Sequence, residues 1–512
     1  MASYLENREH RASTGVSIPL KDLESASTDT NNDHTARWNG FSRFHPSNIL
    51  ANPNTSQNDW LATAEDIWLG LTIALTPSFL QQYVGVEPPQ PTKLHAIAAL
   101  DGLRGWACLL VFNFHFLFTY TWEVAVGWGF AGENWGIHQL PFVHMLISGH
   151  IMVAIFFVIS GYVLSYKPLK TIRSRSFDQT FTVLASSTFR RALRLYIPSL
   201  IGLACVFIAV RLGVYNYSWG VIKEGRTILG TNEQHPLVYK SLYKQSWDWY
   251  YTVARLINPF DWGLYYNNYN PHLWTIPVEF RCSLVLFLTT LATSRLISPV
   301  RMTLVASLTW FCMRYGRWDV VLFLVGMQMA ELDLINGTWE RPAIPSVGTD
   351  DTLHIRFPAE AKWLWDITPW TYGEPHRFPQ TIGAALIVFS INHSPVIQKL
   401  FTNPLSQYLG KISYAFYIVH GPILHSVGYS IMPNIWEITG KETNFQYCLG
   451  FLIGWLICLP ISIWAGDLFW RTVDIPSVKF ARWLEDQLIA KGASVSTTPS
   501  LVTPRSQTPR DQ

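Results

Sequence analysis

The sequence predicts an all-α membrane protein, a polytopic transmembrane bundle of about ten helices. Of its 512 residues, 49% are hydrophobic and only 14% are charged, whereas soluble domains contain about 25% charged residues. The apolar residues gather in long runs and show neither the alternation of a soluble strand nor the single stripe of a surface helix. Composition and patterning therefore both indicate helices that lie in a lipid bilayer.

Charge and cysteine content argue against several other classes of protein. The formal net charge is only +3 and no zinc-finger or homeodomain spacing occurs, so we expect no nucleic-acid partner. The six cysteines stand singly within apolar stretches, which predicts neither a disulfide framework nor a cysteine metal cluster. No short apolar run follows a basic lead at the start of the chain, so we expect the first span to direct its own insertion.

Four regions follow one another along the chain. Residues 1–59 are rich in Ser, Thr, Asn and charge, which predicts a disordered cytosolic tail. Residues 60–93 mix Trp and aliphatic residues with acidic ones, which favours an amphipathic segment at the membrane interface. Residues 94–472 contain the apolar runs and form the predicted transmembrane domain. The last region, 473–512, ends in a Ser/Thr/Pro-rich stretch that we expect to be disordered.

Nine apolar runs approach the roughly 20 residues that a helix needs to cross a bilayer. The expected spans are residues 97–122, 140–165, 193–214, 273–292, 297–313, 318–334, 380–392, 408–432 and 445–470. The run at 380–392 is short, which indicates an incomplete or tilted helix.

Basic residues orient these spans, because cytosolic loops retain Lys and Arg. The loop after the second span is rich in both, whereas residues 123–138 contain neither, which places the amino terminus in the cytosol. Nine crossings would leave the basic carboxyl-terminal region outside, so we expect one further element within 215–271 or 363–372. Among four Asn-x-Ser/Thr sequons, the one at Asn216 lies in a loop predicted to face away from the cytosol, and it is the expected glycosylation site.

Charged and histidine side chains inside the spans are the candidate functional residues, since a charge at mid-span costs about 2.5–3.5 kcal/mol on insertion scales. The first span contains Asp101, Arg104 and His115. Eleven positions of an α-helix bring Arg104 and His115 to one face, about 16 Å apart along the axis. Arginine can bind phosphate, and a deeper histidine can accept a hydroxyl proton. Alternatively, Asp101 pairs with Arg104 at the helix end and His115 contacts a neighbouring helix.

Later spans offer further candidates. His272 and Glu279 are seven residues apart and share a helix face, so Glu279 can hold an imidazolium or pair with an arginine. His420 lies in the middle of the eighth span, where histidines serve either as proton carriers or as helix contacts. Arg191 and Arg194 stand at the cytosolic start of the third span, where anchoring of the span is the alternative role.

Five motifs, taken in order, resemble the membrane acyltransferase 3 family, the O-acyltransferases that modify sugars, antibiotics and fungal metabolites. The motifs are LDGLRG with Arg104 and, eleven positions further on, His115; FFVISGYVLS; the paired-arginine segment with Arg191 and Arg194; HLWTIPVEF with Glu279; and LGKISYAFYIVHGPI with His420. The resemblance covers residues 94–470, and the TIPVEFR variant and the polar amino-terminal tail are similar to those of fungal members.

The resemblance implies that His115 is the catalytic base and that Arg104 supports it or the acyl donor. It also implies that Arg191 and Arg194 matter for activity, and that Glu279 and His420 line the centre of the bundle.

A mechanism follows as a hypothesis. Acyl-CoA, with acetyl-CoA as the default, would place its phosphates near Arg104, Arg191 and Arg194, and His115 would deprotonate an acceptor hydroxyl. Glu279 would orient the imidazole, and His272 and His420 would line the pocket. The expected acceptor is a small molecule or glycan such as a fungal secondary metabolite, and no bound cofactor and no metal are required. The alternative is a proton-coupled transporter, although the two halves of the chain show no internal repeat.

Overall fold

The computed structural model describes residues 72–73, 75–81, 94, 97–225, 227–230, 233–337, 368–369, 371–372 and 374–489. Every regular element among these residues is a helix, as the sequence predicts. The expected disordered tail at 1–59 lies outside the described residues, and so do most of the interfacial segment at 60–93 and residues 490–512. The start of the expected carboxyl-terminal tail is helical.

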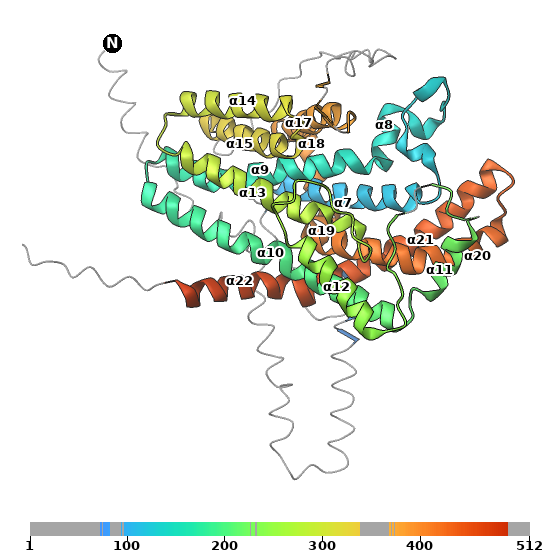
Figure 1. Cartoon of the computed structure of the whole chain (residues 1–512). Helices are drawn as coiled ribbons and strands as arrows, with labels where there is room; N and C mark the ends of the chain where they lie inside the picture. Colours follow the sequence, from blue (N-terminus) through green and yellow to red (C-terminus); the bar gives the residue numbers. More distant parts are fainter. Residues whose placement is uncertain are drawn as a thin grey trace, which may run out of the picture.

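Nine long helices correspond one to one with the nine expected spans. They are α7 (Ala98–Phe118), α9 (Gly149–Arg173), α10 (Phe177–Arg211), α13 (Thr275–Ala292), α14 (Ser298–Arg314), α15 (Trp318–Asn336), α17 (Arg377–His393), α19 (Pro404–Ile423) and α21 (Asn444–Phe469). The other α-helices among the described residues are α6 (Ser78–Gln81), α8 (Pro141–His144), α11 (Asn216–Glu224), α12 (Leu242–Leu256), α18 (Pro395–Phe401), α20 (Tyr429–Thr439) and α22 (Ile475–Leu488). Figure 1 shows the long helices side by side in one bundle, with α8, α11 and α20 gathered at one end.

Two helices begin elsewhere than expected. The second span was expected from residue 140, but α9 begins at Gly149, because Pro141 starts the separate helix α8 and Ser148 leaves the helical region with φ −96° and ψ 93°. The third span was expected from residue 193, but α10 already begins at Phe177. The basic stretch before residue 193 is therefore helical.

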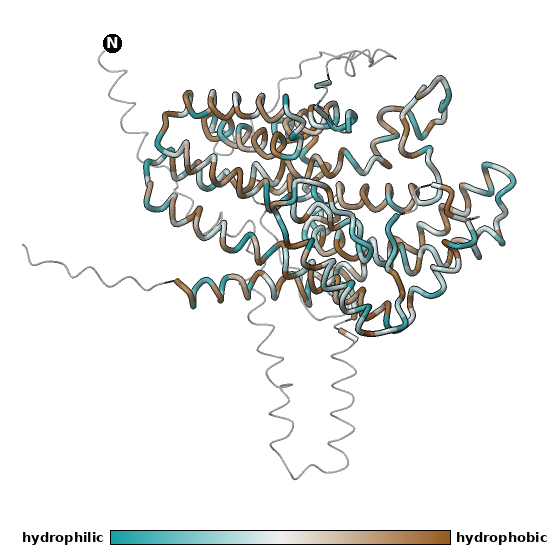
Figure 2. The backbone as a smooth tube through the Cα atoms, in the orientation of Figure 1, coloured by the Kyte–Doolittle hydropathy of each residue, from teal (hydrophilic) through white to brown (hydrophobic). Residues whose placement is uncertain are grey.

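Fewer of the described helices than expected are long and apolar enough to cross a membrane. Within the part of the chain that the structure describes, four stretches qualify, namely Gly149–Arg173, Phe177–Arg211, Pro271–Ala292 and Asn444–Leu488. The pair α17 and α18 would add a fifth, and its two helices meet at a bend of 101°. The expected count of about ten spans is not confirmed. Apolar residues nevertheless follow most of the long helices (Figure 2).

The further element expected within 215–271 or 363–372 is not confirmed as a span. The first of these segments contains α12, whose 15 residues measure about 22 Å against a hydrocarbon core of about 30 Å. The second segment lies mostly outside the described residues.

Close packing at glycines brings the central helices together. Helix α9 contacts α7, α13, α15 and α17. A Cβ atom added to Gly161 of α9 would lie 2.2 Å from the backbone oxygen of Phe323 in α15, so no larger residue fits without moving a helix. The absence of a side chain at Gly161 thus allows α9 and α15 to approach closely.

Helices α7 and α19 run parallel, and this arrangement positions the site. Cys108 donates to the backbone oxygen of Ser413 at 3.2 Å, and one turn later the rings of Phe112 and Phe416 lie 5.8 Å apart. The next pair in this series is His115 and His420, with ring centroids 5.6 Å apart. Both histidines therefore stand at the same level, near the carboxyl-terminal ends of their helices.

Helix α19 continues into α20 through the π-helical segment η8 (Leu424–Gly428). Five positions along an α-helix would turn His425 about 140° away from His420. A π-helical turn closes hydrogen bonds from residue i to i+5, so residues five apart return to nearly the same side. The distortion thus lets both histidines face the interior of the bundle.

Candidate active site

Four histidines and one glutamate meet near the ends of α7 and α19. We call this group the histidine cluster, and its members are His115, Glu233, His272, His420 and His425. The ring of His272 lies 3.9 Å from that of His115, 4.7 Å from that of His420 and 5.9 Å from that of His425. The last three histidines are at most 2% exposed. The predicted residues His115, His272 and His420 are thus brought together.

Glu233 is the centre of the cluster and was not expected from the sequence. Its Oε1 lies 2.6 Å from Nδ1 of His115, and its Oε2 lies 3.1 Å from Nε2 of His272 and 3.0 Å from Nε2 of His425. Burial by itself would raise the pKa of Glu233, but the nearby imidazoles of His115 and His272 hold it well below its usual range. Glu233 is therefore a carboxylate in the folded protein.

The loop that carries Glu233 is held against the end of α7. The backbone N–H of Gly230 donates to the carbonyl of Thr119 at 3.0 Å. This contact brings residue 233 within reach of His115, which is 118 positions away in the sequence. The surrounding sequence, GTNEQHPL, is polar and without periodicity, so only the tertiary contact identifies the residue.

The hydrogen bond to Glu233 decides which nitrogen of His115 can act as a base. A carboxylate accepts the proton of Nδ1, which leaves Nε2 with its lone pair. An imidazole held in this way is oriented, and its protonated form is stabilised by the neighbouring negative charge. The arrangement is suited to general-base chemistry.

Glu279 contacts arginine and not His115. Nη2 of Arg191 donates to Oε1 of Glu279 at 2.5 Å, and the Ser160 hydroxyl donates to the same oxygen at 3.0 Å. Glu279 does share a helix face with His272, but seven residues of helix separate them by about 10 Å along the axis. The carboxylate that orients the imidazole of His115 is therefore Glu233, and the expectation that Glu279 orients it needs correction.

The predicted arginines form a second group, the basic cluster of Arg104, Arg191 and Arg194. The charge of Arg194 interacts with those of the other two and with that of Asp474. Arg104 is about one-third exposed, and its Nη1 lies 3.6 Å from Oδ1 of Asp101. This pair at the helix end is the alternative that the sequence left open for Arg104.

Arg190 is not part of the basic cluster. It pairs with Glu485 of α22 at 3.1 Å. Arg190 therefore joins α10 to α22.

Asn216 begins α11 and is exposed. The hydroxyl of Ser218 in the same sequon is buried and donates to the carbonyl of Tyr215 at 3.0 Å. A sugar on Asn216 would therefore project into solvent from a folded helix end.

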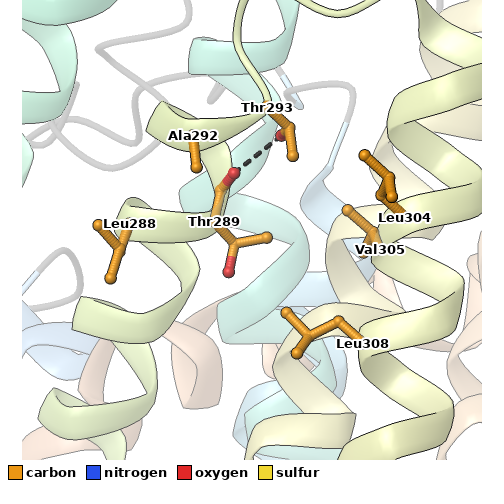
Figure 3. Close-up of a pocket in the computed structure, with 7 residues that line it drawn as sticks. All are labelled: Leu288, Thr289, Ala292, Thr293, Leu304, Val305 and Leu308. Atoms are coloured by element: carbon orange, nitrogen blue, oxygen red, sulfur yellow. Dashed lines mark hydrogen bonds between the residues drawn. The ribbon is translucent and has the colours of Figure 1, made fainter.

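A pocket between α13 and α14 lies away from the histidine cluster (Figure 3). It is lined by Leu288, Thr289, Ala292, Thr293, Leu304, Val305 and Leu308. The lining residues of α13 stand at its carboxyl-terminal end, where Leu288 lies about 24 Å along the axis from His272. The lining contains no group that titrates or binds phosphate, so it offers nothing to the chemistry of the histidine cluster.

Fold and site together define a membrane-embedded enzyme in which a partly buried histidine is held by a carboxylate. A family model described as an acyltransferase domain matches residues 97–471, and the chain belongs to this family, the membrane acyltransferase 3 family. The resemblance seen in the sequence motifs is confirmed.

Three relatives illustrate the match. The chain is 31% identical to the O-acetyltransferase PaAT-1 of Phomopsis amygdali, over 85% of this chain and 90% of that protein. It is 26% identical to the acyltransferase R4 of a Phoma species, over 77% and 97% of the two chains. It is 24% identical to the acyltransferase clz18 of Cochliobolus lunatus, over 76% and 96%. No solved structure matches the chain. The protein is an acyltransferase, and its relatives support O-acyl transfer.

Proposed function

We propose that the protein transfers an acetyl group from acetyl-CoA to a hydroxyl of a small acceptor. One observation carries the proposal: the 2.6 Å contact of His115 Nδ1 with Glu233 Oε1 leaves Nε2 of a partly buried imidazole as the base. His115 also lies in the motif that carries the family resemblance.

The reaction is an ordinary acyl transfer. Nε2 of His115 takes the proton of the acceptor hydroxyl while the hydroxyl oxygen attacks the thioester carbonyl carbon. The C–O bond forms, the C–S bond breaks, and the coenzyme A thiolate leaves with the proton from the imidazolium. Glu233 stabilises the charged imidazole meanwhile, and the apolar surroundings exclude water that would hydrolyse the thioester.

The basic cluster is the proposed binding site for the donor phosphates. Arg104 and His115 lie on one helix, about 16 Å apart along its axis, a separation that the long pantetheine arm can bridge. Asp101 and Glu279 offset part of the arginine charge, so we expect short-range hydrogen bonds from the guanidinium groups to hold the phosphates. With the amino terminus in the cytosol, the donor enters from the cytosolic side.

The proposed acceptor is a hydroxylated small molecule or glycan, with a fungal secondary metabolite as the first candidate. The three relatives above are fungal proteins, and PaAT-1 is named an O-acetyltransferase. Their names favour acyl transfer over the proton-coupled transporter.

Radiolabelled acetyl transfer from acetyl-CoA, in membranes supplied with extracted metabolites, tests the proposal. Because His115 is the base, His115→Ala should lower label incorporation about 10²- to 10⁴-fold. The matched control is His138→Ala, since His138 is 43% exposed and pairs with Glu123 in a loop. Equal labelling by wild type and His115→Ala would remove His115 from the mechanism. No labelling by any variant at equal expression would remove acetyl-CoA or the acceptor class.

A further inference from the structure

Hydrogen bonds fix the tautomer of His272. Its Nδ1 faces Oδ1 of Asn270 at 3.2 Å. The amide nitrogen of Asn270 donates to the carbonyl of Ile418 at 2.8 Å, so Oδ1 can only accept and Nδ1 of His272 must donate. A neutral His272 therefore carries a lone pair on Nε2.

The same reasoning applies to His425 through its neighbour His235. The Ser218 hydroxyl donates to Tyr215, as described above, so it accepts from Nε2 of His235 at 3.2 Å. His235 is buried, and in its neutral form, with Nε2 as the donor, its Nδ1 is bare. Its bare Nδ1 accepts from Nδ1 of His425 at 3.3 Å. A neutral His425 then also carries its lone pair on Nε2.

Both lone pairs point to the same carboxylate oxygen. Nε2 of His272 and Nε2 of His425 lie 3.1 and 3.0 Å from Oε2 of Glu233. With neutral rings, three electron-rich atoms converge without a hydrogen between them, and the other polar contact of Nε2 of His425 is a long one of 3.5 Å to the Tyr429 hydroxyl. Protonating both rings would bury two cations beside one carboxylate that already binds His115, whereas a single divalent cation satisfies all three atoms.

His420 provides an independent sign of a missing partner. Its Nδ1 donates to the carbonyl of Tyr417 at 2.7 Å, and its ring is 1% exposed. Its Nε2 has no hydrogen-bond partner among the described residues, although it belongs to the same group of histidines as His115 and His272. Buried acceptors are rarely left in this state in folded proteins.

We propose that His272, His425 and Glu233 bind a divalent transition-metal ion of the zinc type, through two Nε2 atoms and Oε2. Two histidines and one carboxylate are a known zinc ligand set, which leaves a fourth position open. The ligand separations of 3.0 and 3.1 Å are close to the roughly 3.3 Å between tetrahedral ligands that lie about 2.0–2.1 Å from the ion. Asn270 and His235 would hold the two imidazoles in the metal-binding tautomer.

The ion would join three segments that are far apart in the sequence. It would fasten the loop at residue 233 to η7 (Pro271–Trp274) and to η8, while Oε1 of Glu233 stays bonded to His115. No metal was expected from the sequence, because the cysteines are scattered singly and the reaction requires none. Residues 233, 272 and 425 are too far apart in the sequence to show a ligand pattern. The proposal stands on hydrogen-bond geometry and is independent of the acceptor and the donor.

The first test is the metal content of the full-length protein in detergent, equilibrated with Zn²⁺, desalted and analysed by mass spectrometry of the elements. We expect about one ion per wild-type chain and a clear loss in His425→Ala. His138→Ala is the control and should keep the wild-type content. Wild-type protein without zinc, or His425→Ala with wild-type content, overturns the proposal.

Co²⁺ binding to the wild type keeps the test independent of any variant's folding. Co²⁺ in a four-coordinate site should give strong visible ligand-field bands that excess Zn²⁺ removes, and their absence overturns the proposal. Asn270→Ala then tests the tautomer argument, because releasing Nδ1 of His272 should weaken metal affinity about 10- to 100-fold. Unchanged affinity in chelator competition contradicts that argument.

Discussion

The histidine cluster and the basic cluster compensate their charges in different ways. In the histidine cluster one carboxylate, Glu233, faces three imidazoles. In the basic cluster Arg191 has its own partner in Glu279, and Arg104 has Asp101. The first arrangement allows a proton or a cation to move among its members, whereas the second fixes charges in pairs. In the proposed function, the histidine cluster performs the chemistry, and the basic cluster binds the donor and stabilises the bundle.

The largest expected effect separates the two carboxylates. Glu233→Gln removes the charge that orients His115 and stabilises its protonated form, so kcat should fall about 10²- to 10⁴-fold with little change in KM for acetyl-CoA. Glu279→Gln is the matched change in the basic cluster and should affect KM more than kcat. Equal losses of kcat in both variants would contradict the division of roles.

Arg191→Ala should give the next largest effect, on stability and donor binding together. It leaves the carboxylate of Glu279, whose side chain is 19% exposed, without its ion-pair partner, and breaking such a pair costs about 3–5 kcal/mol. We expect a lower Tm in detergent and a higher KM for acetyl-CoA.

Arg190→Ala is the control for this change, because its pair with Glu485 involves an arginine that is 31% exposed. Pairs near the surface contribute at most about 1 kcal/mol. If the two variants lower Tm alike, the Arg191–Glu279 pair has no special place in the bundle.

Gly161→Val should give the smallest effect and tests how the basic cluster depends on packing. The added side chain would strike the backbone of Phe323, and such overpacking costs about 1–3 kcal/mol. Ser160 next to it donates to Glu279, so we expect a lower Tm and a changed KM with kcat retained.

The control for the packing variant is Gly220→Ala in α11, where an added Cβ meets nothing within 4 Å. Its Tm should equal or slightly exceed that of the wild type, because alanine favours a helix. A fall in kcat of Gly161→Val as large as that of Glu233→Gln would show that the clusters are not separable.

The helices could be predicted well because their signal is local. Each apolar run identified in the sequence coincides with a helix, and the errors lie at boundaries such as Gly149 and Phe177. These boundaries are set by the proline at residue 141 and by the polar first turns of α10. A search for apolar runs detects neither feature. The number of membrane crossings could not be predicted in the same way, because the hydropathy of a helix does not say whether lipid or other helices surround it.

The site could be predicted in part. His115, His272 and His420 stood out because polar side chains are rare within apolar runs, and the structure brings them together. For Glu279 the alternative of an arginine partner is the one seen. His425 was not among the expected site residues, and the π-helical turn at Leu424–Gly428 lets it face the same side as His420.

The sequence by itself determined that this is a helical membrane protein of an acyltransferase family, because apolar runs and ordered motifs are properties of neighbouring residues. Only the tertiary structure decided which carboxylate meets His115. Glu233 lies in a polar loop with no pattern of its own, and it reaches His115 because that loop bonds to the end of α7. A contact between residues 118 positions apart depends on how the helices pack, and no single stretch of the sequence determines that packing.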